Sequence, residues 1–157
     1  MVHISDQAFA DNVRALERTA FSICYLLLKS EADCEDAIGR AILKAYEKRH
    51  QLKEISAFRA WFLAIVKNES MSILRARRRV VPLDEWRESA APSRETLDLF
   101  DALDRLPEAQ KLVLLLRGQG YRVDEIAAIL SVPSGTVKSR IHRAKAAIQT
   151  EYQEESL

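Results

Sequence analysis

Few residues in this chain interrupt a helix. Its 157 residues include only four glycines and four prolines, and residues that favour helices dominate the remainder. Because glycine and proline weaken or end helices, this shortage predicts an all-α protein. The length suits one ordinary domain or two small ones.

The chain also lacks the residue groupings of an enzyme or a metalloprotein. Cys24 and Cys34 have no CxxC spacing, which favours buried free thiols over a disulfide or a metal site. The histidines, His3, His50 and His142, are scattered along the sequence. There is no nucleophile–base set, phosphate-binding loop or ligand cluster. We therefore predict no catalytic residue, no metal and no cofactor.

Long apolar runs are missing as well. Residues 1–10 have neither the cationic start nor the apolar core of a secretory signal. No stretch approaches the roughly 18 uninterrupted apolar residues that span a bilayer. These features predict a cytoplasmic protein without membrane insertion.

The net charge of +1 conceals a strong segregation of charge. Residues 49–79 contain eight basic side chains and two acidic ones, whereas residues 80–106 contain seven acidic and three basic ones. Residues 132–150 contain four basic side chains and no acidic one. Two basic blocks separated by an acidic segment predict two contacts with a polyanion.

The segment from Tyr121 to Ala147 has the pattern of a helix-turn-helix. Its first helix would place apolar residues at i, i+3, i+4 and i+7, namely Val123, Ile126, Ala127 and Leu130. Residues 131–135 break this pattern, and Pro133 is well placed to start the second helix. The apolar face of that second helix is formed by Val137, Ile141, Ala144 and Ile148.

The remaining surface of the second helix is polar and cationic. Such a helix suits the DNA major groove, where cations bind phosphates and read guanine edges. The alternative is a solvated amphipathic helix with a basic face. The predicted DNA contacts are Lys138, Ser139, Arg140, His142, Arg143 and Lys145.

Three helices are expected before residue 80. The first spans residues 5–29, with an apolar stripe of Phe9, Val13, Leu16, Ala20, Ile23 and Leu27. The second spans residues 31–48, with Ser30 as its N-cap and Asp33 as the capping-box partner. It would bury Ala37, Ile38, Ala41, Ile42, Ala45 and Tyr46.

Ser56 is expected to cap the third helix, which would reach Arg79. Its apolar face comprises Phe58, Trp61, Phe62, Ile65, Val66 and Ile73, which makes Trp61 a core residue. The helix ends in four arginines within five residues. A helix dipole favours such charges, but this number exceeds what the dipole requires and predicts contact with nucleic acid or an acidic partner.

Taken in order, these segments resemble bacterial sigma-70 family members of the extracytoplasmic-function (ECF) group. Gly135 to Arg140, followed by Arg143-Ala144, match that group's Gly-Thr-Val-Lys/Arg-Ser-Arg and Arg-Ala pattern. Response regulators share a similar pattern in this half, so the upstream residues decide. The segments that match sigma region two are Asp33 to Asp36, Ile42-Leu43, Phe58 to Phe62, Asn68, and Arg75 to Arg79.

The resemblance implies two helical domains, at residues 2–79 and 94–152, joined by a linker at residues 80–93. Further helices are expected at residues 94–105 and 107–117. The linker would either thread the polymerase channel, where its acids mimic nucleic acid, or serve as an acidic tether.

The implied function is that of a specificity subunit. It would bind core RNA polymerase and promoter DNA, recognise the −10 and −35 elements and promote melting. An anti-sigma factor is a further partner that the resemblance allows. The residues expected to meet the −10 element are Lys67, Asn68, Arg75, Arg77 and Arg78. Those expected to meet polymerase are Asp33, Asp36, Arg40 and Lys44.

Two features depart from the family pattern. Gly39-Arg40 stand where the family has Gln-Glu, which removes an acid and places a poor helix former in mid-helix. The linker is also short. The alternative interpretation is a two-domain helix-turn-helix regulator that is not a polymerase subunit, or a decoy that binds an anti-sigma factor. The residues from Phe58 to Arg79 argue against that alternative.

Overall fold

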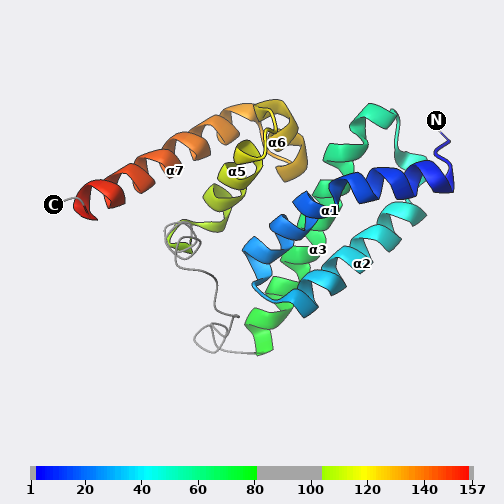
Figure 1. The fold of residues 1–157 in the computed structure, drawn as a ribbon, viewed down its shortest axis with the longest axis horizontal. Helices are drawn as coiled ribbons and strands as arrows, with labels where there is room; N and C mark the ends of the chain where they lie inside the picture. The colour runs from blue at the N-terminus through cyan, green and yellow to red at the C-terminus, as the bar shows by residue number, and fades with distance from the viewer. Residues whose placement is uncertain (1–2, 81–103, 156–157) are drawn as a thin grey trace. The chain divides into compact units, whose positions relative to one another are not determined.

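The computed structural model describes residues 3–80 and 104–155 (Figure 1). Every regular element among these residues is a helix, which confirms the all-α prediction. The chain divides into two compact units, the first holding α1 to α3 and the second holding α5, α7 and most of α6. The predicted linker and the predicted helix at residues 94–105 lie almost wholly outside the described residues, so the domain limits remain predictions.

In the first unit, α1 (Asp6–Leu28), α2 (Glu31–Glu47) and α3 (Phe58–Val80) pack against one another (Figure 1). Two short 3-10 helices, η1 (Arg49–Gln51) and η2 (Ile55–Ala57), connect α2 to α3. Ser56 lies inside η2, so its predicted role as the N-cap of α3 is wrong.

Serine side chains fix the starts of α1 and α2. The Ser5 hydroxyl accepts a hydrogen bond from the backbone N–H of Ala8 at 3.1 Å, and Ser30 accepts one from Asp33 at 3.3 Å. Between them, Lys29 adopts a left-handed φ of 53° that ends α1. The predicted apolar stripe of α1 is buried along its whole length.

The buried face of α2 differs from the predicted one. Its fully buried residues are all small, namely Cys34, Ala37, Ala41 and Ala45. Three of the larger residues predicted to be buried are only half-buried, namely Ile38, Ile42 and Tyr46. Small side chains let helix axes approach closely, so the larger ones move to the flank of the contact.

Aromatic rings form the core at the start of α3. Phe58 and Phe62 are buried and stack with their centroids 5.7 Å apart, and Phe9 of α1 meets Phe58 edge-on at 5.7 Å. Trp61 is half-buried, with its centroid 5.7 Å from that of Phe58. The prediction of Trp61 as a core residue is therefore wrong, because Phe58 and Phe62 already fill the interior.

The second unit contains α5 (Glu108–Gly118), most of α6 (Val123–Leu130) and α7 (Ser134–Glu155), with α5 packed against α7. Pro107 precedes α5, and its carbonyl accepts hydrogen bonds from the N–H groups of Gln110 and Lys111. Gly120, at a φ of 92°, forms the turn that leads to the buried Tyr121.

One charged contact joins the three helices of the first unit. The Arg77 Nε atom of α3 lies 3.1 Å from an Asp33 carboxylate oxygen of α2, and Nη1 donates to the Leu28 carbonyl of α1 at 2.8 Å. The Asp33 carboxylate, predicted as a capping-box partner, thus pairs with Arg77.

We expect Arg77→Ala to lower the free energy of unfolding by about 1–3 kcal/mol, because a carboxylate and a carbonyl lose their partner together. Arg75→Ala, at an exposed position two residues earlier, should change it by less than about 0.5 kcal/mol. Guanidinium unfolding followed by circular dichroism measures both. Equal losses would mean that Arg77 contributes only general charge.

Candidate nucleic-acid interface

The turn between α6 and α7 has the geometry of a helix-turn-helix. Ser131 adopts a left-handed φ of 56°, and the Val132 N–H donates to the Ala127 carbonyl at 3.0 Å, which closes the end of α6. The Pro133 carbonyl accepts hydrogen bonds from Thr136 and Val137 at the start of α7. Pro133 therefore precedes the helix rather than starting it.

Gly135 was predicted to lie in the turn. It is instead the second residue of α7, because the helix starts at Ser134. The break in the apolar pattern thus extends two residues beyond the structural turn.

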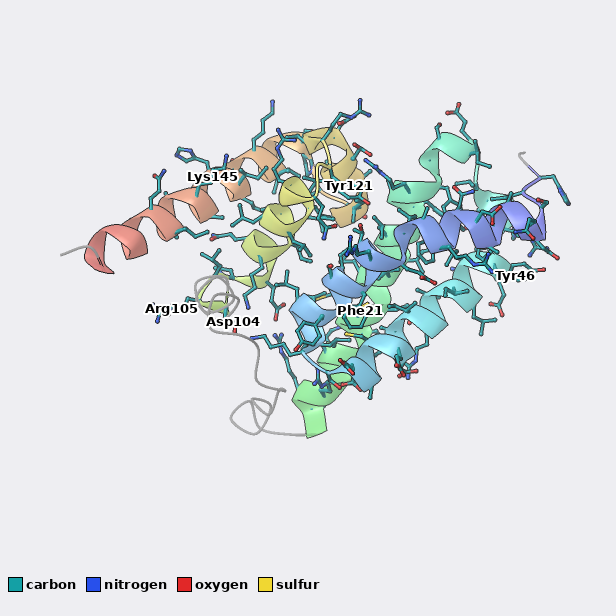
Figure 2. The ribbon with its side chains drawn as sticks, in the orientation of Figure 1. Phe21, Tyr46, Asp104, Arg105, Tyr121 and Lys145 are labelled. Atoms are coloured by element: carbon teal, nitrogen blue, oxygen red, sulfur yellow. The ribbon has the colours of Figure 1, made fainter. Side chains whose placement is uncertain are left out.

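The two faces of α7 differ in burial as the sequence predicts. Val137 and Ala144 are fully buried, while Ile141 and Ile148 are half-buried at the margin of the same seam. Arg140 is also half-buried. The predicted contacts that are exposed are Lys138, Ser139, His142, Arg143 and Lys145. Lys145, for example, projects outward from α7 (Figure 2).

The nearby acids of α6 are paired with a cation of their own. Glu125 accepts a hydrogen bond from the Arg122 backbone N–H at 3.1 Å, and the Arg122 Nε atom lies 3.3 Å from Glu125 and 3.6 Å from Asp124. Since residues 132–150 contain no acid, the exposed face of α7 is cationic from Ser134 to Thr150. It can attract a polyanion over several turns.

A second cationic surface lies at the end of α3. Arg75, Arg78 and Arg79 are exposed, and Asn68 is exposed about two to three turns earlier, whereas Lys67 is half-buried. Arg77, predicted with this group, is instead held between α1 and α2. Half-buried Trp61 and Ile55, which is 51% exposed, add apolar surface near the start of the same helix. Sequence periodicity missed the exposed part of Trp61 because it predicts which face a residue occupies, not how well that face is covered.

The predicted polymerase-binding residues fall into two groups. Asp33 and Lys44 pair with α3, the latter through a 2.6 Å contact with Glu69. Asp36 and Arg40 pair with each other at 3.0 Å on the exposed side of α2. The structure therefore does not gather all four on one free surface.

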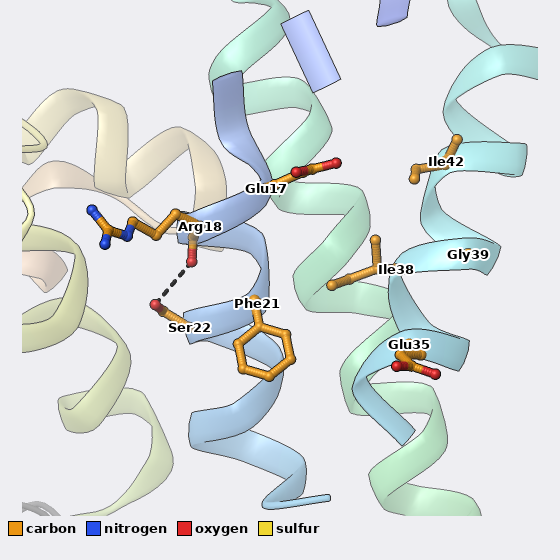
Figure 3. A pocket seen from close by; sticks show the side chains of 8 residues that line it. All are labelled: Glu17, Arg18, Phe21, Ser22, Glu35, Ile38, Gly39 and Ile42. Carbon is orange, nitrogen blue, oxygen red and sulfur yellow. Dashed lines mark hydrogen bonds between the residues drawn. The ribbon is translucent and has the colours of Figure 1, made fainter. Parts of the chain in front are cut away.

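A groove of about 700 Å³ separates α1 from α2 on one flank of the first unit (Figure 3). Phe21 of α1 and Ile38 of α2 project into the space between the helices, and Gly39 leaves the wall open. A Cβ atom added at Gly39 would meet nothing within 4 Å. The signal for this groove in the sequence is that α2 has large apolar residues next to the face formed by its small residues. The full lining is Glu17, Arg18, Phe21, Ser22, Glu35, Ile38, Gly39 and Ile42.

Two further features are absent from the described part of the chain. None of its helices is both long and apolar enough to cross a membrane. Within the same residues, no three His, Cys, Asp or Glu side chains gather as a metal site would require.

Comparison with known proteins agrees with this geometry. Residues 13–80 match Sigma-70 region 2, and residues 96–148 match Sigma-70, region 4. The chain is 28% identical to the ECF RNA polymerase sigma-E factor of Haemophilus influenzae over 96% of both chains. It is also 28% identical to RNA polymerase sigma factor SigV of Bacillus subtilis, over 94% of this chain and 90% of that one.

A solved structure shows the same fold. The sigma factor RpoE from Bartonella quintana, crystallised with the anti-sigma factor NepR, matches with a TM-score of 0.77 at 25% identity. The match covers 92% of this chain and 96% of that one.

A three-helix unit and a helix-turn-helix unit with a cationic second helix define a two-domain DNA-binding transcription protein. The chain belongs to the sigma-70 family and, within it, is an ECF sigma factor. It is a non-catalytic subunit that serves RNA polymerase in promoter recognition, which confirms the predicted function and the predicted lack of enzyme activity.

We expect Trp61→Ala to cost about 1–2 kcal/mol of stability, because the side chain is only half-buried. Phe62→Ala, in the closed core one residue later, should cost about 3–5 kcal/mol. Urea unfolding of the two variants provides the comparison. Losses of the same size in the two variants would mean that Trp61 contributes to the core as much as Phe62 does.

Proposed function

We propose that the two units divide promoter recognition, with α7 binding the −35 duplex and α3 binding the −10 element. The observation that carries this proposal is the exposed face of α7 over residues 134–150, which carries no acid and lies opposite a buried seam. A separate cationic surface at the end of α3 supplies the second contact. Two modest DNA contacts on one chain gain affinity through effective concentration when polymerase holds them at the correct separation.

Within α7, we distinguish residues that read bases from residues that bind phosphates by their position along the helix and by their exposure. Lys138 lies near the helix start, where a side chain enters the major groove deeply, and Arg143 lies on the same stripe. Both are proposed to read guanine edges. Ser139 and His142 reach from the same face. Lys145 and the half-buried Arg140 are proposed to bind phosphates.

The −10 element is proposed to contact the first unit as a partly single strand. Exposed Asn68, with Lys67, Arg75 and Arg78, would hold the strand, and the open side of Trp61 offers an aromatic surface for an unstacked base. Arg77 acts in this proposal through the fold, because its guanidinium already joins Asp33 to the end of α1.

Core polymerase is proposed to bind the outer side of α2 and the groove beside it. The ion pair of Asp36 and Arg40 lies on this side, close to Leu43, which is 60% exposed. A charged surface with an apolar centre is the composition of a specific protein interface. Asp33 and Lys44 would contribute through the parts of their side chains that remain exposed.

The cellular setting follows from the partner. We place the protein in the cytoplasm, where bacterial RNA polymerase works. An anti-sigma factor is included among its proposed partners because the related RpoE was crystallised with NepR.

The −35 assignment predicts different losses for different cations. Lys138→Ala and Arg143→Ala should each cost on the order of 1–3 kcal/mol and relax the preference at a single −35 position. Lys145→Ala should weaken binding to all sequences alike and reduce the salt dependence by about one charge. A library of −35 sequences, transcribed with reconstituted holoenzyme, measures both. If all three variants lose affinity equally for every −35 sequence, α7 contacts only the phosphates.

The polymerase assignment predicts that the open wall of the groove is needed for binding. Gly39→Tyr should keep the domain folded, because nothing lies within 4 Å of the new Cβ and the helix loses a poor helix former. It should nevertheless reduce retention by immobilised core polymerase at least about tenfold, since a ring would fill the docking surface. Gln7→Tyr, on the exposed side of α1, is the matched control.

The same assay distinguishes the alternative function. A wild-type chain that polymerase does not retain, yet that binds promoter DNA tightly at physiological salt, would be a regulator acting without polymerase. Equal retention of wild type and Gly39→Tyr would remove the groove from the interface and leave the sigma function intact.

A further inference from the structure

The helix proposed to bind the −10 strand, α3, contains a single acid. Between Phe58 and Val80 it carries six basic residues, and Glu69 is its one acidic residue. Glu69 directly follows Asn68, which is exposed and is among the residues proposed to hold the strand. A negative charge at this position would repel the phosphates that the cations of the helix attract. The fate of the Glu69 charge therefore affects how well α3 binds DNA.

A cation from the neighbouring helix covers the Glu69 carboxylate. The Lys44 ammonium of α2 donates a hydrogen bond to a Glu69 carboxylate oxygen at 2.6 Å. The side chain of Glu69 is only 12% exposed, whereas that of Lys44 is 48% exposed. The cation is thus the solvent-facing member of the pair, and the acid is the shielded one.

The exposure of this pair argues against a mainly structural role. An ion pair whose cation is half exposed is screened by water and salt, and it adds little to stability. The helices α2 and α3 also pack directly against each other and are joined by the contact between Asp33 and Arg77. Because Lys44 and Glu69 balance each other, the main effect of the pair is on the charge that α3 presents.

We propose that Lys44 is a positioning residue for the −10 strand, because it neutralises the one acid of α3 and holds it toward α2. This inference rests on the proposed binding of the strand to α3. With Lys44 in place, the strand meets Asn68 and the exposed arginines without an opposing charge. Without Lys44, the shielded carboxylate loses its partner and gains free energy by turning to water beside Asn68, where it repels the phosphates.

The test measures the affinity of reconstituted holoenzyme for a fluorescent single-stranded −10 oligonucleotide. A saturating amount of each variant forms the holoenzyme, so that its affinity for core polymerase does not affect the result. Lys44→Met keeps the apolar stem and removes the charge, and it should lower the affinity about fivefold at about 0.1 M salt. Lys44→Arg keeps the cation and should stay within about twofold of wild type.

The variants of Glu69 should act in the opposite direction. Glu69→Gln removes the one acid of α3 and should bind the oligonucleotide at least as tightly as wild type. Lys44→Met combined with Glu69→Gln should return to within about twofold of wild type, because no acid is left to uncover. Equal losses for the two single variants would refute the proposal, since a structural ion pair fails whichever partner is removed. A double variant as weak as Lys44→Met would refute it as well.

A matched control separates a local effect from a general effect of charge. Arg14 of α1 also pairs with an acid, Asp11 at 3.9 Å, and both side chains are largely exposed. Arg14→Met should change the affinity by less than about twofold, because salt screens distant surface charges. A loss as large as that of Lys44→Met would mean that only the total charge matters and would overturn the proposal.

Failure of the proposed function gives a different result. Wild-type holoenzyme that binds the oligonucleotide no more tightly than core polymerase alone would contradict the −10 assignment of α3, and this inference with it. Wild-type holoenzyme that binds the strand, together with unchanged binding by Lys44→Met, would refute this inference alone. Circular dichroism verifies that each variant is folded, and Lys44→Gln replaces Lys44→Met if the latter is not.

Discussion

The close approach of α2 to α1 and α3 is the constraint on which the first unit depends. It is possible because the buried positions of α2 carry only alanines and Cys34. Any larger side chain in this row would separate the helices and disturb several contacts at once, since a close-packed interior yields little. The same approach lets Arg77 reach Asp33 and leaves the isoleucines of α2 to line the groove.

The first unit thus uses some of its charges to hold itself together and leaves others outside. Asp33, Lys44 and Arg77 bind across helices, whereas Arg75 remains exposed. A charge count would assign them all to one partner-binding surface. Their different positions follow from the register in which α2 and α3 pack, which sets the charges that lie within reach of an opposite one.

The end of α6 has the same kind of turn as the end of α1. Both Lys29 and Ser131 adopt the left-handed conformation, and each ends one helix so that another can begin within a few residues. In the second unit the result is a helix whose buried seam is narrow, Val137 and Ala144 being fully buried among residues 134–150. A narrow seam leaves most of the circumference of α7 available, which is what a major groove requires.

The sequence by itself determined the all-α fold, the helix-turn-helix, the family and the cationic face of α7. These follow from local periodicity, capping residues and charge order, such as the Ser30 cap and the acid-free run after Val132. Tertiary structure alone decided the incomplete burial of Trp61 and the structural use of Arg77. Each depends on how closely helices distant in sequence approach one another, and the pattern of a single helix carries no record of that distance.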